Sequence, residues 1–236
     1  MKRNNKVIIA VCCATTIMYA CSSKTEADNI SISGNATLNS QHYEAVNVSG
    51  NLDANKITVT NNTAVSGDVK LTDSQIHSIA ISGQTLLADS QVIGKVNISG
   101  NLTAVHSTIE GQSLNCSGDF KSNKSIYTTP ISLSGNLNTE DDTFNDTITL
   151  SGNVISNHST FNKVITISSA ESTWTNSIVN SDIIEKIDTT LTTPTLTLVN
   201  SKVKGNIEFT KTKGLVILKG SSKVSGKVEN AEVKHS

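Results

Sequence analysis

"ISGN" at 98–101 is one copy of a phrase that recurs through most of the chain. VSGN stands at 48–51, VSGD at 65–68, ISGQ at 81–84, and LSGN at both 133–136 and 150–153. The glycines of this phrase follow one another at intervals of 16 to 18 residues and are Gly34, Gly50, Gly67, Gly83, Gly100, Gly118, Gly135 and Gly152. A repeat of this length is too short for a helical hairpin and fits one coil of a β-solenoid.

Apolar and polar residues alternate on both sides of each glycine. Val46 and Val48 precede Gly50, and Leu52 and Ala54 follow it. Such alternation predicts strands with one buried face. A third segment completes each unit, as in Asp73-Ser-Gln-Ile76, so each coil should hold three short strands. Because one coil cannot bury its apolar face alone, several coils have to stack.

The sequence therefore predicts an all-β protein, a single-stranded parallel β-helix with about 17 residues per coil. A right-handed turn is favoured, since crossovers between parallel strands are generally right-handed. Hydrophobic residues make up 36% of the chain and aromatic residues only 3%, which suits a thin core of β-branched side chains. The net charge of −1 does not suggest a nucleic-acid partner.

The glycine of each phrase is expected to form a structural corner. Glycine tolerates unusual backbone angles and leaves room in a narrow interior. The Ser and Asn beside it have the opposite parity to the apolar residues, so they should face outward. There the Asn, Asp or Gln after each glycine can form a stacked ladder. The alternative is an exposed Asn and Ser face that binds a ligand.

The first twenty residues look like an export signal. Lys2, Arg3 and Lys6 precede a mostly apolar run over 7–18, which is short for a membrane-spanning helix. The following Met18-Tyr19-Ala20-Cys21 resembles the lipobox of bacterial lipoproteins. That resemblance implies that Cys21 is acylated and becomes the mature N-terminus, anchored in a membrane. Ser22 resembles the residue that directs lipoproteins to an outer membrane.

These features divide the chain into three parts. Residues 1–20 are predicted to be the signal peptide, 21–29 the lipidated cysteine with a polar tether, and 30–236 the β-solenoid. The repeat is least regular around 171–194, where the single tryptophan, Trp174, is expected to cover a widened coil or a loop.

Two segments near the C-terminus, Val203-Lys-Gly-Asn-Ile207 and Val224-Ser-Gly-Lys-Val228, resemble the repeats of bactofilin-type polymer-forming proteins. The general pattern is equally similar to exported β-helix adhesins. These resemblances imply self-association or an adhesive role, although a shared fold does not assign a function.

One column of residues could carry chemistry. Asp73, Asp89 and His106 each lie six residues after a corner glycine, so they should be neighbours on consecutive coils. Two carboxylates and an imidazole could bind a divalent metal. The stronger interpretation is that these residue types favour the turn that opens the third strand. Lys124 and Asp141 occupy the same place on the next coils and extend no ligand set.

Other candidate sites are weaker still. The acidic run 140–142 is expected to be a solvated loop rather than a calcium site. Cys116 takes the place of a buried apolar residue and is expected to be one, rather than a catalytic thiol. No phosphate-binding loop, zinc spacing or nucleophile elbow occurs, so we expect no cofactor and no enzyme activity.

Charge is unevenly distributed. Residues 202–236 hold eight Lys and three Glu, a net charge of +5, whereas 100–201 carry −6. The basic end could contact anionic envelope polymers, lipid head groups or another copy of the chain. Alternatively, the lysines discourage unwanted strand pairing at an open edge. The candidate residues are Lys211, Lys213, Lys219, Lys223 and Lys227.

The sequence thus favours a membrane-anchored lipoprotein of the cell envelope, held by its lipid at the outer membrane on the periplasmic or surface face, which acts as a structural scaffold or adhesin-like interaction rod. The alternative is a carbohydrate-binding or carbohydrate-active β-helix protein. A groove with clustered acids and aromatic residues would favour that alternative.

Overall fold

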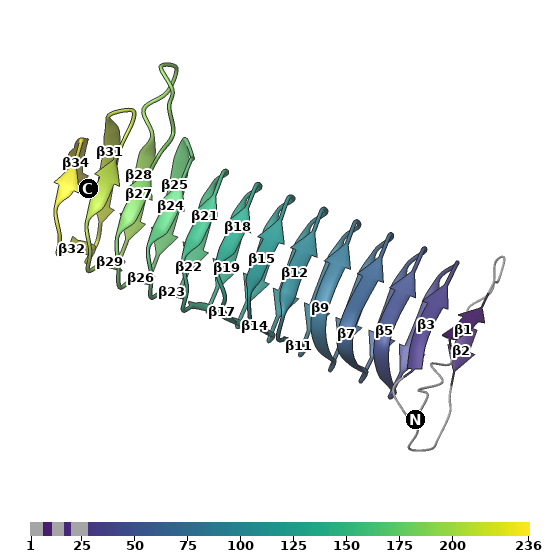
Figure 1. Ribbon diagram of the computed structural model, residues 1–236. Helices are drawn as coiled ribbons and strands as arrows, with labels where there is room; N and C mark the ends of the chain where they lie inside the picture. Colours follow the sequence, from purple (N-terminus) through teal and green to yellow (C-terminus); the bar gives the residue numbers. More distant parts are fainter. Residues whose placement is uncertain (1–6, 11–16, 20–27) are drawn as a thin grey trace.

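The computed structural model describes residues 7–10, 17–19 and 28–236. All its regular elements are parallel β-strands, which wind into a straight stack of coils (Figure 1). Twelve coils lie between Asp28 and His235. At about 4.8 Å per coil, the stack is roughly 50 Å long. The predicted fold class is confirmed: neighbouring coils are about 17 residues apart, and three strand positions make up each turn.

The strands form three columns that run along the rod. The first column leads out of the glycine corner and consists of β2 (Ile17–Tyr19), β4 (Ala36–Asn39), β6 (Leu52–Asn55), β8 (Val69–Thr72), β10 (Thr85–Ala88), β13 (Leu102–Val105), β16 (Phe120–Asn123), β19 (Leu137–Glu140), β22 (Val154–Asn157), β25 (Glu171–Thr175), β28 (Thr195–Val199), β31 (Gly214–Lys219) and β34 (Ala231–His235).

The second column holds the short third segment of each unit, in β11 (Gln91–Val92), β14 (Thr108–Glu110), β17 (Ile126–Thr128), β20 (Thr143–Phe144), β23 (Thr160–Phe161), β26 (Ile178–Val179), β29 (Lys202–Val203) and β32 (Lys223–Val224). The third column leads back into the glycine corner through β1 (Val7–Ala10), β3 (Asp28–Ile32), β5 (His42–Val48), β7 (Thr58–Val65), β9 (Gln75–Ile81), β12 (Lys95–Ile98), β15 (Ser113–Cys116), β18 (Ile131–Leu133), β21 (Ile148–Leu150), β24 (Ile165–Ile167), β27 (Ile183–Glu185), β30 (Ile207–Phe209) and β33 (Val228–Glu229).

The early coils differ from the expected three separate strands. Strands β5, β7 and β9 each run through both the second and third columns, and register shifts at Tyr43/Val46 and Val59/Asn62 provide the bend. From β11 onward the two columns separate. Gly94 and Gly111 lie at this bend, and Gly111 adopts a φ of +125°, which favours glycine.

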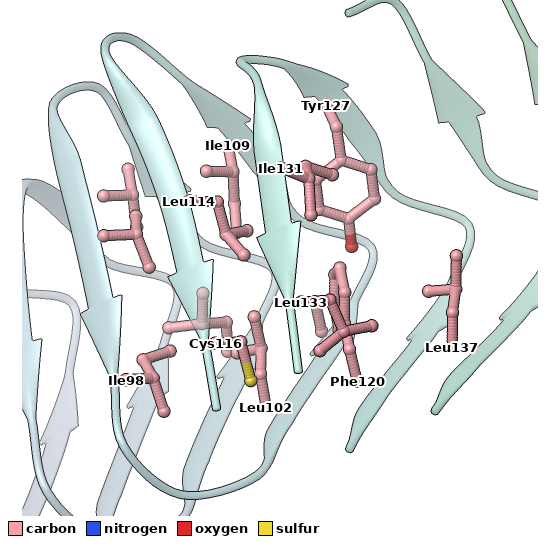
Figure 2. Packing of buried hydrophobic residues seen from close by; sticks show 14 of the residues in the cluster. Ile98, Leu102, Ile109, Leu114, Cys116, Phe120, Tyr127, Ile131, Leu133 and Leu137 are labelled. Carbon is pink, nitrogen blue, oxygen red and sulfur yellow. The ribbon is translucent and has the colours of Figure 1, made fainter. Parts of the chain in front are cut away.

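The core is a continuous row of buried side chains between the columns (Figure 2). Tyr127, Phe144 and Phe161 stack with centroids 4.8 and 4.7 Å apart. Phe120 and Trp174 close the two ends of this stack with edge-to-face contacts. Trp174 is therefore a fully buried core residue, in contrast to the covering role expected from the sequence.

The corner glycines are needed because consecutive coils approach very closely there. A Cβ atom on Gly100 would lie 2.3 Å from the carbonyl oxygen of Gly83, and one on Gly135 would lie 2.4 Å from that of Gly118. Both distances are far inside van der Waals contact with rigid backbone. Among the described residues, only Gly111 and Gly220 are glycines with positive φ, so crowding, not backbone angle, explains the repeated glycine.

The irregular region is narrower than 171–194. Strands β25, β26 and β27 continue the stack through residue 185, and the extra residues form a loop over 186–194 that projects beside β28 (Figure 1). Glu185 replaces the usual apolar residue before the corner, and its Oε1 accepts the N–H groups of Ser169 and Ile187 (3.0 Å each). Burial raises the pKa of Glu185 to about 6. Leu191, in the loop, is 92% exposed.

We predict that Gly100→Ala lowers the free energy of unfolding by about 2 kcal/mol or more, because the new methyl group meets the backbone of Gly83. The neighbouring Ser99→Ala is the matched control, since Ser99 is exposed, and should change stability by no more than about 0.5 kcal/mol. Urea unfolding followed by circular dichroism measures both. Equal losses in the two variants would refute the crowding explanation.

Candidate functional site

The column that contains Asp73, Asp89 and His106 is a second corner of the coil. Every residue of this left-handed corner has a φ between 48° and 56°, a region that side-chain-bearing residues seldom adopt. Its members, each at the end of a first-column strand, are Ser40, Lys56, Asp73, Asp89, His106, Lys124, Asp141, His158, Asn176 and Asn200. Gly220, at φ 62°, also adopts this conformation. Backbone geometry thus accounts for the Asp, Asn, His and Gly found there.

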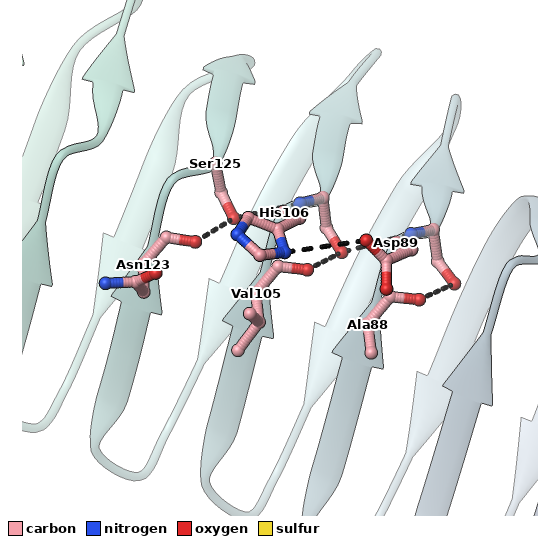
Figure 3. A network of polar contacts seen from close by, with 8 residues as sticks. Ala88, Asp89, Val105, His106, Asn123 and Ser125 are labelled. Carbon is pink, nitrogen blue, oxygen red and sulfur yellow. Dashed lines mark hydrogen bonds and ion pairs between the residues drawn. The ribbon is translucent and has the colours of Figure 1, made fainter.

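The metal hypothesis gains little from the geometry. Nδ1 of His106 lies 3.5 Å from Oδ1 of Asp89, and both side chains are about half exposed (Figure 3). Within the described part of the chain, no three His, Cys, Asp or Glu side chains come together as a group able to hold a metal ion. An exposed pair of this kind contributes little to stability.

A column of buried serines follows the left-handed corner, and the sequence reasoning missed it. The Oγ of Ser107 donates to the carbonyl of Val105 (2.9 Å) and accepts the N–H of Ser90 (3.2 Å). The same two bonds recur from coil to coil (Figure 3). The members of this serine column are Ser74, Ser90, Ser107, Ser125, Ser159, Ser177 and Ser201. Each of these serines precedes a buried residue by two positions, so the alternation of inward and outward residues in the sequence could have predicted that it points inward.

Asp142 replaces serine in one coil, so the expectation of a solvated acidic loop is wrong for this residue. It is 1% exposed, and its Oδ1 accepts bonds from the Ser122 hydroxyl (2.9 Å) and the Ser125 N–H (2.7 Å). Its Oδ2 accepts the N–H of Glu140 (3.1 Å) and the hydroxyl of Thr139. Burial raises the pKa of Asp142, although these bonds oppose the rise. The carboxyl group is enclosed by its own coil and the preceding one, which suits a structural role.

Cys116 is buried, as the sequence predicted. Its Sγ lies 3.4 Å from the carbonyl oxygens of Gly100 and Gly118, at the glycine corner. Burial raises the pKa of its thiol, which disfavours the reactive thiolate.

The residues after the corner glycines form the expected outward ladder, but through a different bond. The Oδ1 of Asn51 accepts the backbone N–H of Asp68 (2.8 Å), and Oδ1 of Asp68 accepts that of Gln84 (2.8 Å). Asn35, Asn101, Asp119 and Asn136 accept in the same way. A side-chain oxygen at the δ position is what this bond needs, so Asn and Asp are interchangeable.

An open groove of about 680 Å³ lies on the outer face of the first column, across β4, β6, β8, β10 and β13. One side is the ladder row Asn35, Asn51, Asp68, Gln84 and Asn101. The other is the strand row Thr37, Asp53, Lys70, Leu86 and Thr103, whose members are paired in register from coil to coil. No sequence signal distinguished these five coils from the others.

The structure divides the five candidate lysines among several corners. Lys211 and Lys213 lie in the turn between β30 and β31, beside the 186–194 loop, which Thr212 contacts at Thr189. Lys219 ends β31 and Lys223 begins β32, where it stacks on Lys202. Lys227 precedes β33. All five are exposed on the last two coils, so they share one end of the rod but form no single cluster.

Cys21 lies outside the described residues, and the lipoprotein signal stays a prediction. Strands β1 and β2, from within the predicted signal peptide, are paired with β3 and β4. Within 7–10, 17–19 and 28–236, the structure contains no helix with the length and apolar character needed to span a bilayer.

Comparisons with models of protein families, with curated proteins and with solved structures give no match for this chain.

We predict that His106→Asn and His106→Gly unfold within about 0.5 kcal/mol of the wild type, because both residues tolerate positive φ. His106→Val should lose about 1–2 kcal/mol, since a β-branched side chain is strained there. Urea unfolding of the three variants provides the comparison. If Asn and Gly are as damaging as Val, the imidazole itself is needed and the backbone explanation fails.

Proposed function

We propose that this chain is a lipid-anchored structural protein of a bacterial cell envelope, which acts as a scaffold or adhesin-like interaction rod. The observation that supports this proposal most directly is that the two ends of the stack differ. The first coil after Cys21 begins at Asp28, seven residues further on, whereas the lysine-rich coils lie at the opposite end of the stack (Figure 1). An anchor at Cys21 would therefore hold one end of the rod at a membrane and present the other end roughly 50 Å away.

The packing of the rod supports a structural role. Its interior is filled by a single apolar core, and the buried polar groups Ser107 and Asp142 are engaged by neighbouring coils. The outer faces are regular and polar, which suits contacts repeated along a surface. In this proposal the basic end contacts anionic envelope polymers or another copy of the chain, through electrostatic attraction that salt would screen.

The anchor is tested by Cys21→Ser in the native host. We expect an unprocessed precursor that incorporates no labelled palmitate, because the acylated thiol is gone, and that is not held at the membrane by lipid. Cys116→Ser is the matched control: this thiol is buried in the core and should leave labelling unchanged. Labelling that persists in the Cys21 variant, at the same processing site, would contradict the lipoprotein proposal.

A further inference from the structure

The groove between the ladder row and the strand row has a repeat that a ligand could match. Its lining residues come from five consecutive coils, so it runs along the rod for about four coil steps, or roughly 19 Å. Positions on the strand row recur in register at every step, as with Lys70, Leu86 and Thr103, although their side chains differ from coil to coil. The ladder row repeats an amide or carboxylate at every step, so a ligand lying in the groove would meet one such group per coil. This geometry fits an extended polymer better than a compact small molecule.

The lining chemistry fits hydroxyl groups. The Oδ1 atoms of Asn35, Asn51 and Asn101 accept backbone N–H groups, which leaves their Nδ2 groups as outward donors. Asp68 has one carboxylate oxygen in the ladder and a second that can accept. The hydroxyls of Thr37 and Thr103 can do both. A hydroxyl also donates and accepts, so an alternation of donors and acceptors suits a polyhydroxyl chain.

Charge and topology disfavour the other extended polymers. Asp53 and Asp68 outweigh Lys70, so the ionisable residues of the groove carry a net charge of −1 and would repel a polyanion. A peptide strand binds sheets by hydrogen bonding to an exposed edge. The groove lies on the face of the first column, where each of β6, β8 and β10 is already paired on both sides.

We infer that this groove binds a neutral, extended polysaccharide lengthwise, with successive sugars on successive coils. An extended β-1,4-linked chain advances per sugar by nearly the spacing between coils, and successive sugars are turned by about half a turn, so alternate sugars can make equivalent contacts with the ladder row on every second coil. Leu86 supplies an apolar surface for a sugar ring, and the ladder row supplies hydrogen bonds to the hydroxyls. The inference deepens the interaction-rod function proposed above, but does not depend on the anchor at Cys21.

The test is isothermal titration calorimetry of the full chain in detergent, with β-1,4-linked glucose and N-acetylglucosamine oligomers from dimer to hexamer. Affinity should rise with chain length until the oligomer spans the groove, and then level off. Thr103→Arg, which places a long side chain in the groove, should weaken binding of the hexamer at least about tenfold. The matched control is Asn138→Arg, on the same strand row but outside the groove, which should bind like the wild type.

Unfolding curves of both arginine variants would show that each is folded as stably as the wild type. The inference is overturned if no oligomer binds, if affinity is independent of chain length, or if the two variants lose binding equally. Binding of an anionic polysaccharide in preference to the neutral oligomers would also overturn it. None of these results would affect palmitate labelling at Cys21, so failure here is distinguishable from failure of the anchor.

Discussion

The structure depends on the close approach of backbones at the glycine corner. A Cβ atom at Gly100 would lie 2.3 Å from the carbonyl oxygen of Gly83, so the corner can stack at this spacing only if it carries no side chain. Once the corners coincide, the alternation of the flanking strands places apolar residues over apolar residues in every coil. The continuous core and the polar outer rows both follow from this alignment. The corner glycine is absent after Ile167, and one coil later the buried carboxylate of Glu185 accepts the N–H groups of Ser169 and Ile187. The chain then enters the 186–194 loop.

A second constraint operates at the left-handed corner. Its positive φ favours Asp, Asn, His or Gly, which fill most of its positions, and the serine that follows bonds to the backbone of two coils. Each buried bond of this kind contributes about 1 kcal/mol, and leaving its partner unsatisfied would cost more. Along the rod the serine column therefore fixes the spacing of the coils on the side opposite to the glycines. Asp142 keeps the bond from the neighbouring coil, since it accepts the N–H of Ser125, but in place of the serine's donation to a carbonyl its carboxylate accepts the N–H of Glu140 and the hydroxyls of Ser122 and Thr139.

The period and parity of the sequence were sufficient to predict the coil, the three strand positions and the outward row of Asn and Asp. They were not sufficient where a residue's role depends on the neighbouring coil. The glycines were expected to serve either backbone angle or crowding, and only the distances between coils decide for crowding. The ladder bond to backbone N–H depends on the distance between adjacent coils, which a sequence does not state. Parity could have revealed the serine column, since Ser74 precedes the buried Ile76 by two residues.

Surface features were predicted least well for a related reason. The five basic-end lysines are close in sequence but lie at different corners, because a coil of about 17 residues distributes neighbours around the rod. The groove is formed by the outer surfaces of five coils, and its shape depends both on the sizes of the side chains and on the path of the strands. Asp142 was misassigned because three consecutive acids suggest a solvated loop, whereas only Asp142 has the parity of the serine column.

The central claim is that one coil is the unit of the structure and that the corners set its register. Deleting residues 136–152 tests it most directly, since this removes one coil of 17 residues and joins Gly135 to Asn153 at equivalent positions. Phe161 would then stack on Tyr127, and Ser159 would accept the N–H of Ser125 in place of Asp142. Urea unfolding should remain a single cooperative transition with a β-sheet circular dichroism spectrum, while deletion of 136–143, about half a coil, should abolish it. Loss of cooperative folding in the whole-coil deletion, or its retention in the half-coil deletion, would contradict this account.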